Sequence, residues 1–280
     1  MTSKSKSSPK FSQQNVAILG LGKIGTILLQ AMLREGLLSP SRIHATVTHP
    51  EKAAVLSKEL GIDVSTDNAA AVRNADIVIL AVKPQTVGSV LTGLRDVLRS
   101  NQLLISVAAS VPTAYMEERL AAKVPVVRAM PNTPSMLGVG MTGICKGSNA
   151  TAVQLELAQT MFNTVGRTAV VEEKHMDAVT GLSASGPAFI YIIIESLAEA
   201  GVKVGLARDL ATLLAAQTTM GAAKVVLETG QHPAQLKDAV TTPAGCTIDG
   251  ILELEEGKLR VTLIKAVVKA AQRAKELVFS

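Results

Sequence analysis

Short apolar runs alternate with amphipathic stretches from Val16 to Val171. Several runs, such as residues 77–80, are apolar at every position, which is typical of strands in a parallel sheet covered on both faces. The alternation therefore predicts βαβ units. The expected strands are 16–19, 43–47, 77–81, 103–107, 126–129, 140–144 and 168–171, and the expected helices between them are 24–35, 51–60, 86–98, 114–120 and 152–163.

Strand-like runs disappear after Glu172, and long helical patterns follow. From Leu259 to Leu277, apolar side chains recur at spacings of three or four residues and form one stripe. The most apolar run, 187–194, ends at Glu195 and is far shorter than the ~20 residues that cross a bilayer, so we expect a buried helix and no membrane association. The expected helices are 177–180, 188–200, 207–228, 233–240, 248–255 and 259–279.

The composition narrows the class of protein. Apolar residues make up 48% of the 280 residues and aromatic residues only 2%, so the core must be aliphatic and rich in alanine. The formal charge of +5 owes much to Lys4, Lys6 and Lys10, and no basic stripe with interleaved aromatic residues follows, which argues against nucleic-acid binding. Cys145 and Cys246 are far apart, as in a reduced intracellular protein, so we expect a cytoplasmic location. The histidines and cysteines lack metal-ligand spacing, so no metal is expected.

A glycine pattern, Gly20-x-Gly22-x-x-Gly25, separates the first expected strand from the first expected helix. The first glycine permits a tight turn, the second lets the backbone approach a pyrophosphate, and the third allows close helix–strand packing. The phosphates would lie against N–H groups at the positive end of the helix dipole. A merely structural glycine turn is the alternative. The residues predicted to contact a dinucleotide here are Gly20, Leu21, Gly22, Lys23, Ile24 and Gly25.

The end of the second expected strand indicates which dinucleotide binds. An NAD site usually has an acidic residue there, which holds the ribose 2′-hydroxyl. This chain instead has Thr46, Thr48 and His49, followed by Lys52, and these donors favour the 2′-phosphate of NADPH. The nearby Glu51 keeps NADH as the alternative cofactor, and an exposed loop is the alternative for His49 and Lys52.

Two further strand ends are expected to line the cofactor, because an open parallel sheet binds its ligand at the carboxyl ends of its strands. Lys83 either lies near the nicotinamide or is an exposed loop lysine. Asn132 and Thr133 either bind the cofactor or cap a turn. The residues expected to line the cofactor are Ala81, Val82, Lys83, Pro84, Val107, Ala108 and Ala109.

These patterns predict an α/β fold with two domains after a disordered basic tail at residues 1–14. Residues 15–172 would form a Rossmann-type NAD(P)-binding domain, and residues 173–280 an all-helical dimerisation and substrate domain. The many alanine-rich apolar helices of the second domain would bury faces against a second copy, so we expect at least a homodimer.

The segment 241–247 offers hydroxyl groups and turn residues immediately before a helix. Its N–H groups can converge on a carboxylate without a charged side chain. The Thr247 hydroxyl would reach the reacting group of a small substrate, unless it only caps the helix, and N-capping is likewise the alternative for Ser185. No acid–base dyad is evident, which suits hydride delivery to a protonated C=N bond, where positioning matters most.

Five segments together resemble the pyrroline-5-carboxylate reductase family, and the resemblance runs in order from Asn15 to Phe279. The last two segments are the specific ones, whereas the glycine motif is shared widely. The segments are Gly20-Leu21-Gly22-Lys23-Ile24-Gly25, Ala81-Val82-Lys83-Pro84, Pro131-Asn132-Thr133-Pro134, DAVTGLSASGPA at 177–188 and QLKDAVTTPAGCT at 235–247.

The resemblance implies an oxidoreductase that reduces 1-pyrroline-5-carboxylate to L-proline with NAD(P)H, the last step of proline biosynthesis. It also implies a helical domain that interlocks with a partner, in some members within a ring of dimers. By the resemblance, Asn68 would contact the cofactor, and the Thr247 hydroxyl would assist at the substrate ring nitrogen as the catalytic group. The implied substrate-binding residues are Glu173, Thr242, Gly245, Cys246 and Thr247.

The substrate loop departs from the family pattern. Ala244 stands where glycine is common, so a left-handed backbone angle there would be strained, and Cys246 adds a thiol. A reductase of another cyclic imine acid is therefore one alternative. A β-hydroxyacid dehydrogenase is another, although such enzymes use a lysine on a helix of the second domain and the expected helix 207–228 offers only Lys224. A non-catalytic dinucleotide-binding regulator is the third.

Overall fold

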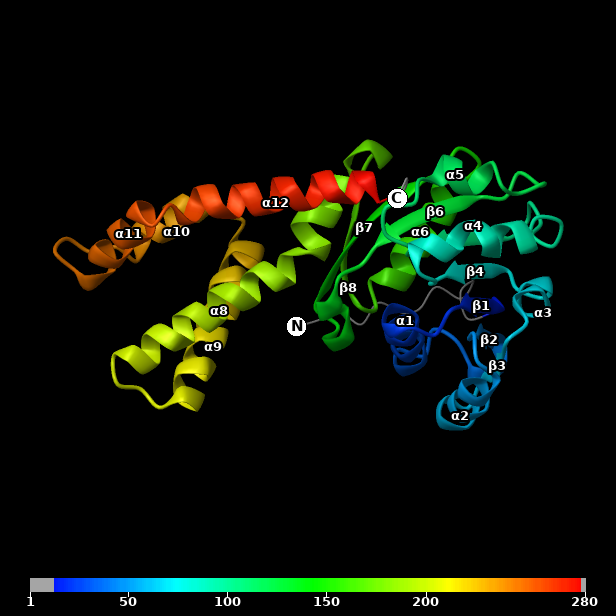
Figure 1. Cartoon of the computed structure of the whole chain (residues 1–280), viewed down its shortest axis with the longest axis horizontal. Coiled ribbons are helices and arrows are strands. Elements are labelled where there is room, and N and C mark those ends of the chain that lie inside the picture. Colours follow the sequence, from blue (N-terminus) through cyan, green and yellow to red (C-terminus); the bar gives the residue numbers. More distant parts are fainter. Residues whose placement is uncertain (1–12, 278–280) are drawn as a thin grey trace. The chain divides into compact units, whose positions relative to one another are not determined.

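The computed structural model describes residues 13–277, which form two compact units. Unit 1 comprises residues 13–184 together with 270–277, and unit 2 comprises residues 185–269. The α/β class, with a sheet domain before a helical region, is confirmed (Figure 1). The structural division follows Ala184 and not Glu172, because the intervening residues form ion pairs with the sheet. The tail expected at residues 1–14 lies almost wholly outside the described residues.

Within residues 13–277, eight strands form one sheet in the order β3-β2-β1-β4-β5-β6-β7-β8 (Figure 1). Strands β1 to β6 pair in parallel, β7 runs antiparallel to β6, and β8 pairs in parallel with β7. The strands are β1 (Val16–Leu19), β2 (Ile43–Thr46), β3 (Asp63–Ser65), β4 (Ile77–Leu80), β5 (Leu103–Ser106), β6 (Val126–Met130), β7 (Gly140–Lys146) and β8 (Gly166–Val170).

Each predicted strand is present, with ends that differ by no more than a few residues. The pattern missed β3, because this short edge strand contains a single apolar residue, Val64. It also missed the reversal of β7, although the short connection between Met130 and Gly140 cannot provide the crossover that a parallel pair needs.

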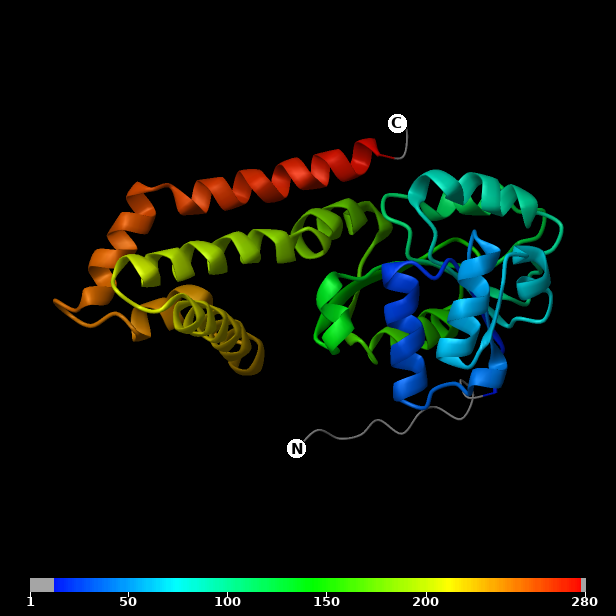
Figure 2. The same ribbon diagram turned by 60° about the horizontal axis from the view of Figure 1, so that its bottom comes forward.

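Helices cover both faces of the sheet, as its fully apolar strands predict (Figure 2). Successive strand residues point to opposite faces. Val16 and Ile18 therefore belong to one buried cluster, and Ala17 and Leu19 to the other. The first cluster includes side chains of α1 (Lys23–Arg34), α2 (Pro50–Leu60) and α6 (Ala152–Phe162), and the second includes side chains of α3 (Asn68–Arg73), α4 (Pro84–Gly93) and α5 (Thr113–Glu117).

Unit 2 is helical, and its two longest helices pack through the small residues Ala198, Ala211 and Ala215. The helix expected to be buried at 187–194 is not buried in the single chain, since Tyr191 is 60% exposed. That prediction is wrong for a lone chain. The helices are α8 (Gly186–Lys203), α9 (Arg208–Thr229), α10 (Pro233–Ala239), α11 (Cys246–Glu256) and α12 (Leu259–Glu276), which begins in unit 2.

Two helical stretches of the described chain, Glu173–Lys203 and Arg208–Thr229, are long and apolar enough to cross a membrane by length and composition alone. Helices that bury an apolar face against another protein chain have the same length and composition, so this finding does not by itself distinguish the two environments.

Candidate active site

The glycine pattern forms a turn between β1 and α1 that leaves room for a phosphate-bearing ligand. Gly20 has φ +100°, and a Cβ there would lie 2.9 Å from the Ala81 carbonyl oxygen, so the turn needs glycine. A Cβ on Gly25 would collide with the Gly20 carbonyl oxygen. Gly22 faces open space, and no side chain of the described residues caps α1, so its first N–H groups stay available. These residues fit a dinucleotide pyrophosphate.

The residues predicted to line the cofactor gather at one edge of the sheet. The parallel strands β2, β1, β4 and β5 are neighbours, so their carboxyl ends lie together. The amides of Gly20 and Leu21 donate to the Thr46 carbonyl oxygen at 3.1 and 3.2 Å, and the Ala81 amide donates to the Leu19 carbonyl oxygen at 2.9 Å. The strand order reverses at β1, which is where open α/β sheets bind ligands. The other predicted residues at this edge are Val82, Lys83, Pro84, Val107, Ala108 and Ala109.

Two side chains fix the region between the glycine turn and β2. The Thr46 hydroxyl donates to Asn68 Oδ1 at 2.7 Å, which brings the first residue of α3 to the carboxyl end of β2. Lys52 Nζ lies 3.4 Å from the Leu21 carbonyl oxygen, so its charge lies beside the glycine turn. The structure thus joins Thr46, Asn68 and Lys52 to the candidate dinucleotide site.

Three other predicted side chains lie on the surface. Thr48 and Lys83 are exposed. His49 is exposed too, and its Nδ1 lies 3.7 Å from Glu51 Oε1. Such surface ion pairs contribute little free energy and hold a side chain loosely. The cofactor contacts of these three residues therefore stay predictions.

Glu173 belongs to a polar cluster inside unit 1. Its Oε1 accepts a hydrogen bond from the Thr113 amide at 2.7 Å, and its Oε2 accepts one from the Thr113 hydroxyl at 2.5 Å. Arg128 Nη1 lies 3.6 Å from Glu173 Oε1, and Arg128 Nη2 lies 3.4 Å from Asp177 Oδ1. Both carboxylate oxygens of Glu173 are therefore engaged within the chain, which favours a structural role over contact with a substrate nitrogen.

Sequence reasoning missed Arg128 and Asp177. The Arg128 side chain is only 4% exposed although it stands on the apolar strand β6. A charged residue inside such a run is the available signal, because charged side chains are almost never fully buried unless they are paired.

Asn132 links two segments: its Nδ2 donates to the Ser183 carbonyl oxygen at 3.2 Å, and its Oδ1 accepts from the Met141 amide at 2.9 Å.

Cys145 faces Arg128 across the antiparallel pair of β6 and β7. Burial raises the pKa of the Cys145 thiol to about 12, and the negative charge of Glu173 adds to the rise, whereas Arg128 opposes it. The thiol therefore stays protonated at neutral pH and is a poor nucleophile.

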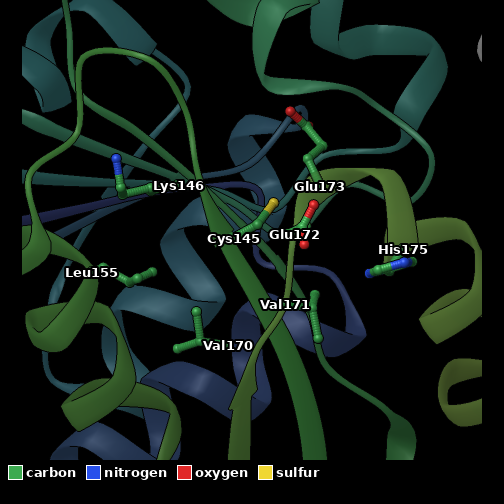
Figure 3. A pocket seen from close by; sticks show the side chains of 8 residues that line it. All are labelled: Cys145, Lys146, Leu155, Val170, Val171, Glu172, Glu173 and His175. Carbon is green, nitrogen blue, oxygen red and sulfur yellow. The ribbon is translucent and has the colours of Figure 1, made fainter.

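A cavity of about 610 Å³ lies beside the same cluster, at strands β7 and β8 (Figure 3). Figure 3 shows Lys146 and Leu155 on one side of it and His175 on the other, with Cys145 and Glu172 between them. Glu173 is the only one of its lining residues that the sequence predicted as a site residue. Because β7 and β8 stand at the end of the sheet order, away from β1 and β4, this cavity is separate from the dinucleotide edge.

The predicted substrate loop leads into α11 in unit 2. Gly245 is the N-cap, and no side chain in the described part of the chain caps α11, so Thr247 in the first turn is not a helix cap. Ser185 likewise occupies the N-cap of α8 without a side-chain bond to it. Ala244 has φ +57°, the left-handed angle at which an alanine is strained, and a Cβ on Gly245 would collide with the Thr242 hydroxyl. The first N–H groups of α11 thus remain available to an anion.

A Rossmann-type sheet with an open glycine turn, followed by a helical unit, defines a dinucleotide-binding protein of the reductase and dehydrogenase class. Residues 173–277 match the family model described as pyrroline-5-carboxylate reductase dimerisation, and residues 15–110 match the one described as NADP oxidoreductase coenzyme F420-dependent. A pyrroline-5-carboxylate reductase of Methanosarcina acetivorans is 47% identical over 264 residues, which cover 94% of this chain and 98% of the relative. The chain belongs to the pyrroline-5-carboxylate reductase family.

Solved structures of the same family share the whole fold. A pyrroline-5-carboxylate reductase from Coxiella burnetii superposes with a TM-score of 0.88 at 37% identity, covering 95% of this chain and 99% of that protein. The Plasmodium falciparum pyrroline carboxylate reductase, solved with NADP bound, gives a TM-score of 0.86 at 30% identity and covers 96% of this chain and 99% of that protein. These matches confirm the family resemblance and favour it over the dehydrogenase and regulator alternatives.

Proposed function

We propose that the protein reduces 1-pyrroline-5-carboxylate to L-proline, with NADPH as the preferred nicotinamide cofactor. One observation carries this proposal within a chain of this family: the uncapped first turn of α11. Its N–H groups and the Thr247 hydroxyl have no hydrogen-bond partner among residues 13–277. This arrangement suits a small substrate that has a carboxylate and a polar ring nitrogen next to each other.

The chain's own residues perform binding and orientation. The first-turn N–H groups of α11 hold the substrate carboxylate at the positive end of the helix dipole. The Thr247 hydroxyl forms a hydrogen bond with the ring nitrogen and fixes the plane of the C=N bond. The bound cofactor supplies the hydride. Because the imine is already protonated, the carbon needs only that hydride to become the CH–NH centre of proline, and positioning is the main catalytic contribution.

The preference for NADPH rests on the end of β2. Lys52 Nζ lies beside the glycine turn, and the Thr46 hydroxyl and Asn68 are tied to each other at the same edge. A 2′-phosphate gains from a nearby ammonium group. The first residues after β2, Val47 and Thr48, carry no charge.

The apolar faces of unit 2 support a homodimer. Side chains such as Tyr191 and Leu213 are 60% and 64% exposed in the single chain, and they lie in the segment that matches the dimerisation model. Burial of these faces against a second copy would remove them from water without a membrane. We further propose that the dimers assemble into a ring, which light scattering would test. We also propose that the protein is cytoplasmic and binds no nucleic acid.

Steady-state assays of NADPH consumption test the reaction directly. We expect rapid turnover of 1-pyrroline-5-carboxylate with NADPH, slower turnover with NADH, and little with the six-membered cyclic imine acid. Faster turnover of the six-membered ring would show that the substrate is another cyclic imine acid. Oxidation of a β-hydroxyacid with NADP⁺, followed as NADPH formation, or cofactor binding with no turnover of any of these compounds, would refute the proposal.

A further inference from the structure

The residues that lead into α11 form a tight turn of a defined type. The Gly245 amide donates to the Thr242 carbonyl oxygen at 3.1 Å, which closes a four-residue β-turn. Pro243 occupies the second position, where the ring holds φ near −65°. Ala244 occupies the third position with φ +57°. A negative φ followed by a positive φ is the signature of a type II turn.

Alanine is a poor residue for the third position of a type II turn, because its Cβ clashes with the following carbonyl group at positive φ. A type I turn uses the same hydrogen bond and tolerates proline equally well at the second position, but its third residue has a negative φ that suits alanine. The two turns differ mainly by a rotation of the Pro243–Ala244 peptide plane. Replacing glycine by alanine therefore brings type I into competition with type II without breaking the turn.

That rotation changes what the turn presents to a ligand. It exchanges the directions of the Ala244 N–H group and the Pro243 carbonyl group just before the uncapped first turn of α11. A donor directed toward a carboxylate attracts it, whereas a carbonyl oxygen in the same place repels it. The turn needs glycine at position 245, because a Cβ there would collide with the Thr242 hydroxyl.

We propose that Ala244 is a positioning residue that weakens the binding of the substrate carboxylate by dividing the turn between type II and type I conformers. This inference rests on the proposed function of the same loop. Only the type II fraction binds, so the apparent affinity falls by that fraction, while the bound complex and its hydride-transfer step are unchanged. The residue therefore raises KM for the small carboxylate substrate and leaves kcat alone.

Three variants test this inference, and the chain provides a matched control. Lys258 is exposed and also has a left-handed φ of +56°, but it lies beyond the opposite end of α11. Lys258→Gly relieves the same kind of strain away from the substrate loop. Ala244→Gly and Ala244→Asn both introduce residues that accept positive φ, and Asn does so without the flexibility of Gly.

The expected result is a fall of about twofold to tenfold in KM for 1-pyrroline-5-carboxylate in Ala244→Gly, with a smaller fall in Ala244→Asn and kcat within about twofold of the parent. Lys258→Gly leaves KM unchanged. Unchanged or raised KM in Ala244→Gly, or an equal fall in Lys258→Gly, would overturn the inference.

Thermal unfolding separates this inference from the proposed function. Ala244→Gly and Lys258→Gly both raise Tm if both residues are strained, whatever the substrate is. A parent protein without reductase activity would refute the proposed function, and the Tm of Ala244→Gly would then still decide whether the turn is strained. No rise in that Tm would overturn the conformational basis of the inference.

Discussion

Removal of the Arg128 guanidinium tests the polar cluster that joins β6 to the segment after β8. In Arg128→Met the apolar stem remains, while Glu173 and Asp177 lose their cation. Breaking a buried ion pair from one side destabilises a protein by about 3–5 kcal/mol. Here the side chains of Glu173 and Asp177 are 32% and 33% exposed, so water partly replaces the arginine.

Two further features of the cluster reduce the expected loss of stability. Glu173 keeps both hydrogen bonds from Thr113, and Arg128 Nε is a buried donor without a partner among the described residues, so its removal relieves a penalty. We therefore expect a loss of about 2–3 kcal/mol in the free energy of unfolding. Urea titrations at one fixed protein concentration measure it, because dimer stability depends on concentration.

Arg34→Met is the matched control. Arg34 Nε lies 3.3 Å from Glu35 Oε1, but both side chains are about half exposed. Exposed pairs of this kind contribute less than about 1 kcal/mol. If Arg128→Met lost no more stability than Arg34→Met, the cluster would not hold the segment, and the reasoning from burial would be refuted.

Three other predictions concern the candidate site. Thr247→Ala lowers kcat by about tenfold to a hundredfold, the effect of losing one placed hydrogen-bonding group, and an unchanged kcat in steady-state assays would contradict its catalytic role. Lys52→Ala raises KM for NADPH by about tenfold and leaves KM for NADH nearly unchanged, whereas an equal rise for both cofactors would argue against a 2′-phosphate contact. The pKa of Cys145 is raised from 9.0 to about 12 in the folded protein. The stabilisation that its buried, neutral thiol gives the folded state is therefore complete below pH 9.0 and is lost as the pH rises toward 12, because the thiol then ionises. At neutral pH a thiol reagent therefore labels the exposed Cys246 of the parent protein. The folded Cys246→Ser variant retains only the buried, protonated Cys145 and stays unlabelled. Rapid labelling of that variant would refute the protection of Cys145.

The parts of the fold that depend on local pattern could be predicted from the sequence. The apolar strands and the glycine turn leave marks in a few consecutive residues. The edge strand β3 and the helix α3 were missed, because the strand has one apolar residue and the helix is short.

Pairings over long sequence distances could not be predicted. Arg128 meets Glu173 and Asp177 only after the chain has formed β7, α6 and β8, so the local pattern marks a charge inside an apolar strand but not the partners of that charge. Burial in unit 2 was also misjudged. An apolar helix face indicates that the helix packs against another element. The pattern of 187–194 does not indicate whether that element belongs to the same chain or to a second copy.

Transfer of label from the cofactor to the product tests the proposed reaction most directly. The enzyme would be incubated with 1-pyrroline-5-carboxylate and NADPH that carries deuterium at both positions of nicotinamide C4, and the product would be examined by mass spectrometry and NMR. We expect L-proline with a single deuterium at the ring carbon that was part of the C=N bond. Proline without deuterium, or no proline while 1-pyrroline-5-carboxylate remains, would contradict hydride transfer to the imine.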